Sequence, residues 1–142
     1  MTINQGSIIS IRGSVVDVRF LKHLPEPNNL LKTGTNQRVA LEVVTYLSSE
    51  IVRTIALTPT QGLARGSTVI DTGHPLQVPV GNANLGRMFN VFGETIDGRS
   101  PLSEQPKRSL HAAPIPLSDR ATTTDIFLTG IKAIDVLAPL EN

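Results

Sequence analysis

Residues 8–20 read IISIRGSVVDVRF and carry the strongest signal for the fold. Apolar side chains alternate on odd positions as far as Ile11, and then on even positions over Val16–Phe20. Gly13-Ser14 lies where the phase changes. A one-residue change of face is typical of a β-bulge or a sharp bend, where glycine is favoured. We therefore predict a strongly bent strand, of the kind with which small barrels turn their corners.

The following residues continue in short β-type runs. Alternation or β-branched content marks Val39–Val43, Ile51–Leu57, Thr68–Asp71 and Leu76–Val80. Arg53 interrupts the apolar face that we assign to Ile51–Leu57, and Pro79 restricts the last run to an edge or a strand end. Four to six short strands within about 80 residues favour a closed or nearly closed antiparallel barrel. A β-sandwich competes with it, and periodicity alone leaves both open.

A different pattern begins inside Val80–Gly98, which we interpret as a domain junction. Apolar residues at i, i+3, i+4 and i+7 predict a helix over Leu85–Phe92, with Asn84 as N-cap and Gly93 at the C′ position. A proline-rich loop over Glu94–Pro116 should follow. This long loop is uncommon inside a self-contained domain.

The last part of the chain predicts two more elements. They are a short strand in Asp125–Leu128 and a helix over Ile131–Leu137, with Thr129 as N-cap. The sequence stops directly after this apolar helix, which we interpret as truncation.

Composition excludes several classes of protein. The formal net charge is +1 without a basic stripe, which disfavours nucleic-acid or membrane-surface binding. The chain has no cysteine, so it offers no disulfide, thiolate metal site or thiol nucleophile. It has neither a signal-peptide pattern near its start nor an apolar run of the roughly 18 residues that a membrane span needs. We expect a cytoplasmic protein whose membrane association, if any, runs through partners.

Two segments nearly match the phosphate-binding pattern G-x-x-x-x-G-K-[ST], namely Gly81–Met88 and Gly93–Ser100. A phosphate loop needs backbone amides at the start of a helix. Pro101 follows the second segment, and Glu94 and Asp97 would place negative charge inside the anion site. Met88 offers no hydroxyl for Mg²⁺ in the first. Turns are therefore the favoured interpretation of both.

No other catalytic or metal-binding pattern stands out. His23, His74 and His111 lie far apart, and Asp71 with His74 forms a metal pair only in principle, a solvated turn being favoured. No nucleophile constellation is visible. Lys107-Arg108 is interpreted as solvated surface.

Seven segments together resemble the beta subunit of F-type ATP synthases. They are LEV at Leu41–Val43, VRTIAL at Val52–Leu57, T-x-G-L-x-R-G at Thr60–Gly66, D-T-G-x-P at Asp71–Pro75, VPVG at Val78–Gly81, LGRMFNVFGETIDG at Leu85–Gly98 and TGIKAIDVLAPL at Thr129–Leu140. The resemblance covers residues 6–140 in register. Thr95 and Leu140 replace the family's usual proline and tyrosine, and Ser48-Ser49 lacks a common glycine. These departures are typical of a divergent branch.

The resemblance implies a mainly β fold. A six-stranded antiparallel barrel in residues 1–81 would precede the truncated start of an α/β RecA-like nucleotide-binding domain in residues 82–142. In the family the Walker A loop follows TGIK-x-ID-x-LAP, so its catalytic, nucleotide-binding and metal-binding residues fall outside 1–142. The site residues expected here are therefore none.

The resemblance also implies a function and partners. The parent protein would make or hydrolyse Mg-ATP, with ADP as its counterpart, coupled to proton or sodium transport, while this segment would hold no cofactor and serve assembly. Its partners would be alpha subunits in an alternating ring of six and the central rotor stalk. It would bind no nucleic acid, would not insert into the membrane, and would lie in the cytoplasm against the inner membrane of a bacterium. The alternatives are a related rotary or secretion-type ATPase subunit and a free-standing small-barrel binding module.

Overall fold

The computed structural model describes residues 3–102, 105–120 and 125–141. The chain divides into two compact units, Met1–Ala112 and Ala113–Asn142, and each is described by itself.

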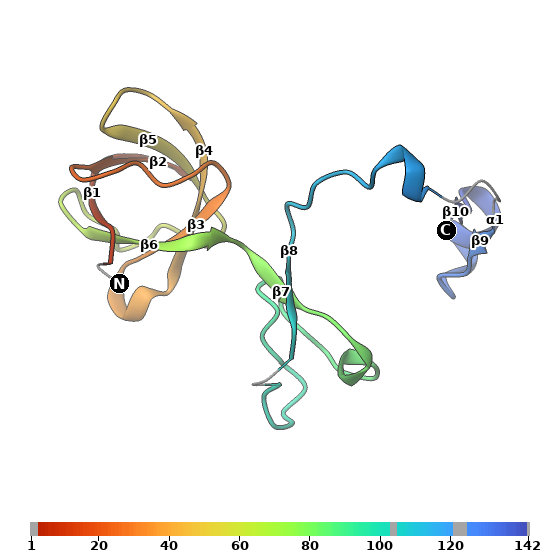
Figure 1. Cartoon of the computed structure of the whole chain (residues 1–142). Coiled ribbons are helices and arrows are strands. Elements are labelled where there is room, and N and C mark those ends of the chain that lie inside the picture. The colour runs from red at the N-terminus through yellow and green to blue at the C-terminus, as the bar shows by residue number, and fades with distance from the viewer. Residues whose placement is uncertain (1–2, 103–104, 121–124, 142) are drawn as a thin grey trace. The chain divides into compact units, whose positions relative to one another are not determined.

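Six antiparallel strands of the first unit form a closed barrel (Figure 1). They are β1 (Gln5–Arg12), β2 (Val15–Phe20), β3 (Asn29–Thr33), β4 (Val39–Tyr46), β5 (Ile51–Ala56) and β6 (Thr68–Pro75). Their order around the barrel is β1-β2-β5-β4-β3-β6, and β6 pairs back with β1. The barrel prediction is confirmed, and closure decides between barrel and sandwich.

Residues 8–20 form two strands, so the prediction of one bent strand is wrong. Arg12 pairs with Val15, which leaves Gly13-Ser14 as a two-residue hairpin turn. Gly13 has a φ of 63°, in the left-handed region that glycine enters without a steric penalty. The register also shifts between Ile8 and Ser10, so a bulge at Ile9 lies in β1. The change of phase therefore arises from a bulge and a turn together.

The barrel interior is filled mainly by aliphatic side chains. Its core consists of Ile8, Val16, Val18, Phe20, Leu31, Val39, Leu41, Val43, Val52 and Val69. The even positions of Val16–Phe20 are buried, as their alternation predicts.

The prediction of which side chains of β5 face the barrel interior is wrong. Val52 and Thr54 are buried, whereas Ile55 is 44% exposed. The Thr54 hydroxyl donates a hydrogen bond to the Val16 carbonyl oxygen at 2.7 Å, and this bond lets a polar side chain occupy the interior.

Beyond the barrel, β7 (Gln77–Pro79) and β8 (Lys107–Ser109) form a two-stranded ribbon. Pro79 pairs with Lys107 at the end of β7, consistent with the strand-end position predicted for this proline. Strand β8 lies within the segment predicted to be entirely loop.

Residues 85–92 form no helix, so the helix predicted there is wrong. A single 3-10 turn, η2 (Asn82–Asn84), ends where Leu85 becomes extended. Gly86, inside the predicted helix, adopts a φ of 70°, which a right-handed helix excludes. The segment instead folds back on itself, with a bridge between Phe89 and Thr95.

The second unit is small. It contains the 3-10 turn η3 (Leu117–Asp119), β9 (Ile126–Phe127), α1 (Lys132–Leu137) and β10 (Leu140–Glu141), and β9 pairs with β10. The short strand and the helix predicted here are confirmed. Ile131 rather than Thr129 occupies the N-cap position of α1.

A further 3-10 turn, η1 (Thr35–Gln37), joins β3 to β4 in the first unit. Among the described residues, no helix is long and apolar enough to cross a membrane.

Candidate functional site

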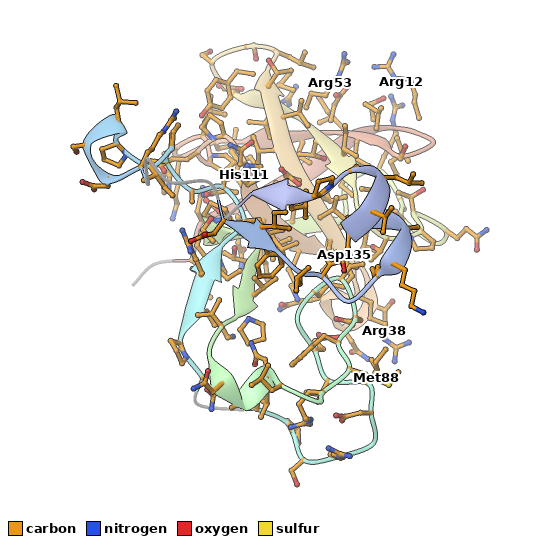
Figure 2. All side chains as sticks on the ribbon, turned by 90° about the vertical axis from the view of Figure 1, so that its right-hand side faces the viewer. Arg12, Arg38, Arg53, Met88, His111 and Asp135 are labelled. Carbon is orange, nitrogen blue, oxygen red and sulfur yellow. The ribbon has the colours of Figure 1, made fainter. Side chains whose placement is uncertain are left out.

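An arginine-bound carboxylate links three strands on the outside of the barrel. Asp17 on β2 is 4% exposed and accepts hydrogen bonds from Arg53 Nε at 2.9 Å and Arg12 Nη2 at 3.0 Å. Figure 2 labels the two arginines next to each other at the top of the view. The hydrogen bond from Arg53 lowers the pKa of Asp17 below its ordinary value; burial opposes the shift and Arg12 adds to it. Asp17 is therefore ionised at neutral pH and suited to tie strands together, not to act as a general acid.

A second ion pair closes the segment that was predicted to be a helix. Arg87 donates to both oxygens of Asp97, one of them through Nη2 at 3.1 Å, and to the Ser100 carbonyl oxygen at 2.9 Å. The hydrogen bonds from Arg87 hold the pKa of Asp97 well below its ordinary value. Asn90 shapes the turn between them, because its Oδ1 accepts from the amides of Phe92 and Glu94. Residues 87–97 thus form a self-supporting hairpin.

Neither near-match to a phosphate loop has the geometry for phosphate binding. Among the described residues, no α-helix begins in or directly after Gly81–Met88 or Gly93–Ser100. Asp97 lies in the second segment and already binds Arg87. Arg99, which stands where such a loop has lysine, directs its Nη1 to the Gly86 carbonyl oxygen.

Polar side chains around the turn that holds Asp71 and His74 form a hydrogen-bonded cluster. Asp71 accepts hydrogen bonds from the side-chain amides of Asn4 and Asn29, each at 3.2 Å, and from the Gly73 amide at 2.9 Å. The Nδ1 of His74 contacts the Pro75 carbonyl oxygen at 2.8 Å. The two side chains therefore have separate partners, and within the described part of the chain no cluster of three or more His, Asp or Glu side chains could hold a metal.

The other two histidines lie elsewhere. His111 Nε2 contacts Glu42 Oε1 on β4 at 2.9 Å, which connects the residues after β8 to the barrel. The His23 carbonyl oxygen accepts from Asn4. The structure brings none of the three histidines together as a site.

The second unit exposes many of its large apolar side chains. Its exposed large side chains are Ile115, Leu117, Ile126, Phe127, Leu128, Ile131, Ile134, Val136, Leu137 and Leu140. Its turn before α1 is well ordered by Asp135, whose carboxylate accepts from the Thr129 hydroxyl at 2.6 Å and from the amides of Thr129 and Gly130. Exposed apolar side chains in this number suit contact with another part of a protein.

Sequence reasoning missed the partners in these clusters. Arg53 was visible as an interruption of an apolar face, but its partner Asp17 lies 36 positions away. The Arg87–Asp97 pair spans ten positions, a spacing that no helical or strand period suggests. The alternation of Val16 and Val18 did carry one usable signal, since it places Asp17 on the outer face.

Known proteins are similar to this chain both in the barrel region and over most of its sequence. Residues 8–73 match the profile of the ATP synthase alpha/beta family, beta-barrel domain. The chain is 58% identical over 127 residues to an ATP synthase subunit beta from Acaryochloris marina, a match that covers 89% of this chain. It is 54% identical to ATP synthase subunit beta 1 from a Marinomonas species over 97% of this chain. It is 53% identical to ATP synthase subunit beta 2 from Albidiferax ferrireducens over 98%.

The chain spans 27–29% of the length of these three relatives. Three of the seven motifs that carry the sequence resemblance lie on strands of the observed barrel, with LEV on β4, VRTIAL mostly on β5 and D-T-G-x-P on β6. Fold and profile agree over the barrel, where the profile matches residues 8–73, and the sequence identity extends over 89–98% of the chain. The chain therefore belongs to the ATP synthase alpha/beta family, and within it to the beta subunits.

Proposed function

We propose that this chain is the N-terminal part of the catalytic beta subunit of a rotary F-type ATP synthase, and that its barrel serves assembly of the catalytic ring. The observation that carries the proposal is identity above 50% to three ATP synthase beta subunits over 89–98% of the chain. In the assembled enzyme, alpha subunits would alternate with this subunit in a ring of six around the rotor stalk. The complex would act at the cytoplasmic face of a bacterial inner membrane.

The barrel suits a static role in such a ring. Its six strands close on themselves, its interior is packed with aliphatic side chains, and the Asp17 cluster ties β1, β2 and β5 together from outside. Interiors packed in this way resist deformation. A ring whose other parts change shape during turnover needs such a rigid element to keep its subunits in register.

We further propose a boundary at residue 81, with the barrel domain in residues 1–81 and the first part of a nucleotide-binding domain in residues 82–142. Strand β6, the last of the barrel, ends at Pro75, and the apolar side chains of the second unit are suited to contact a larger domain. Mg-ATP or Mg-ADP would bind to residues of the parent protein that lie outside this chain.

A chimera tests the assembly role. The barrel of a relative's beta subunit is replaced by residues 1–81 of this chain, and the chimera is expressed with that relative's alpha and rotor-stalk subunits. We expect a complex with Mg-ATPase activity close to that of the relative. A chimera whose barrel is folded by circular dichroism but which forms no ring contradicts the proposal.

Calorimetry tests the absence of a nucleotide site. The 142-residue chain should release no binding heat with Mg-ATP at micromolar concentrations, whereas the relative's assembled ring should. Saturable micromolar Mg-ATP binding by the chain alone, unchanged in Lys32→Gln and Lys107→Gln, would show that residues 1–142 hold the nucleotide site.

A further inference from the structure

We propose that a cavity beside the barrel binds a small organic dianion that carries a flat apolar group. The cavity has a volume of about 610 Å³ and is lined by β3, β6, the β7–β8 ribbon and the turn around Phe92. Sites for small molecules are typically of 300–1,000 Å³ and combine apolar walls with a few polar groups. This site is distinct from the assembly role proposed above and does not depend on it.

Two lysines supply the charge of the site from different elements. Lys32 lies on β3 of the barrel and Lys107 lies on β8 of the ribbon, and both line the cavity. The ion pairs within the described part of the chain involve neither of them. Clefts lined by charges of one sign concentrate ions of the opposite sign. A ligand with two negative oxygens could satisfy both ammonium groups at once.

Glu94, the one carboxylate in the lining, offsets the charge of one of the two lysines, so these three side chains together leave a net positive charge. Glu94 Oε2 already accepts a hydrogen bond from Asn90 Nδ2 at 2.8 Å, within its own turn. A second cavity of about 330 Å³ shares Lys32, Phe92 and Glu94 with the first and adds Arg38. The two cavities together are thus lined by three cationic side chains and one carboxylate.

The remaining lining favours an organic ligand over a bare inorganic ion. Phe92 is half-buried between the two cavities, and Leu76, Pro79 and Leu102 add apolar surface to the first. An aromatic side chain offers a face on which a flat group can stack. Gln77 and Thr95 supply neutral hydrogen-bonding groups at the wall. A dianion with an aromatic or other flat portion therefore matches the lining in both charge and shape.

The site would also connect two parts of the first unit. A ligand held by Lys32 and Lys107 touches both the barrel and the ribbon. A ligand that binds only when the barrel and the ribbon are both folded stabilises the folded state of both. Binding should therefore slow amide exchange in β8.

Phenyl phosphate is the probe, because it joins a dianionic head to an aromatic ring. It is titrated into the ¹⁵N-labelled 142-residue chain, and amide shifts are followed by NMR. We expect saturable shifts in β3, β8 and residues 92–95, with a Kd of about 1 mM for a ligand of this size. Binding should weaken with added salt, which screens charges. Inorganic phosphate should bind more weakly, and phenol should bind without localised saturation.

Single variants test the two lysines. Lys32→Gln and Lys107→Gln should each weaken binding about fivefold, the range of a partly exposed charge pair. Lys22→Gln, at an exposed lysine that does not line either cavity, is the matched control and should bind as the parent does. Circular dichroism shows that each variant is folded.

Three outcomes would overturn the inference. They are the absence of saturable shifts, equal weakening in Lys22→Gln, and inorganic phosphate binding as tightly as phenyl phosphate. None of them bears on ring assembly by the chimera, so the two proposals fail separately.

Discussion

Replacing Leu31 with alanine should remove a large part of the barrel's stability. Leu31 is fully buried on β3, where it pairs with Leu41 of β4 on one side and Asp71 of β6 on the other. Leu→Ala changes in packed cores cost about 2.7–5 kcal/mol, depending on how far the surroundings collapse into the void. Hydrogen bonds on both sides of β3 limit that collapse, so we expect about 3–4 kcal/mol. A domain of about 70 residues has roughly 3.5–10 kcal/mol of stability in total.

Urea unfolding measures this loss with two probes. Far-UV circular dichroism follows the strands, and the fluorescence of Tyr46, the only tyrosine in a chain without tryptophan, reports from β4. If the closed barrel unfolds as one unit, the two transitions coincide and shift together to lower urea. Leu21→Ala is the control, because Leu21 is 78% exposed and its loss should change stability by less than about 0.5 kcal/mol. A loss below about 1 kcal/mol for Leu31→Ala, or separate transitions, would refute the reasoning.

Three further perturbations address other parts of the first unit. In Gly6→Ala, the new Cβ would lie 2.6 Å from the Arg19 carbonyl oxygen, so urea unfolding should show a loss of about 2 kcal/mol. Asp17→Asn should cost about 1–2 kcal/mol at pH 7. The pKa of Asp17 is lowered in the folded state, so its contribution to the free energy of unfolding is present above the ordinary carboxyl pKa and is lost as pH falls through the folded value. The free energies of unfolding of parent and variant should therefore converge in acid. A difference in free energy that stays constant with pH contradicts this. Arg87→Gln should speed amide hydrogen exchange in residues 88–96 and leave exchange in the barrel unchanged. If exchange in residues 88–96 does not change, contacts other than the Arg87–Asp97 pair hold the hairpin.

Local pattern predicted the strands because one face of each is buried. The alternation in Val39–Val43 and Val16–Phe20 reports the inside of the barrel directly. It failed at Ile51–Leu57, where apolar residues occupy both faces and burial selected Val52 and Thr54. A threonine is tolerated inside only because it finds the Val16 carbonyl across the sheet, and that partner is set by strand pairing.

The helix predicted over residues 85–92 shows the limit of periodicity. The apolar spacing is real, but Leu85 and Met88 are 79% and 60% exposed. A helix at this position would therefore gain no stability from tertiary packing. Gly86 lies inside the pattern with a positive φ, and Arg87 reaches Asp97 instead of a helical neighbour. The candidate ligand site was invisible for a similar reason, because Lys32 and Lys107 come together only through folding.

Closure of the barrel by its first and last strands sets the order in which the chain can fold during synthesis. Strand β1 pairs with β6, and 56 positions separate Arg12 from Thr68. At 5–20 residues per second, a ribosome needs roughly 3–11 s to add that length. Until then β1 and β3 each lack one neighbour, and unpaired strand edges invite pairing with other chains. The nascent subunit therefore passes through an interval in which chaperone binding at these edges would be most useful, and the interval ends once β6 has left the exit tunnel.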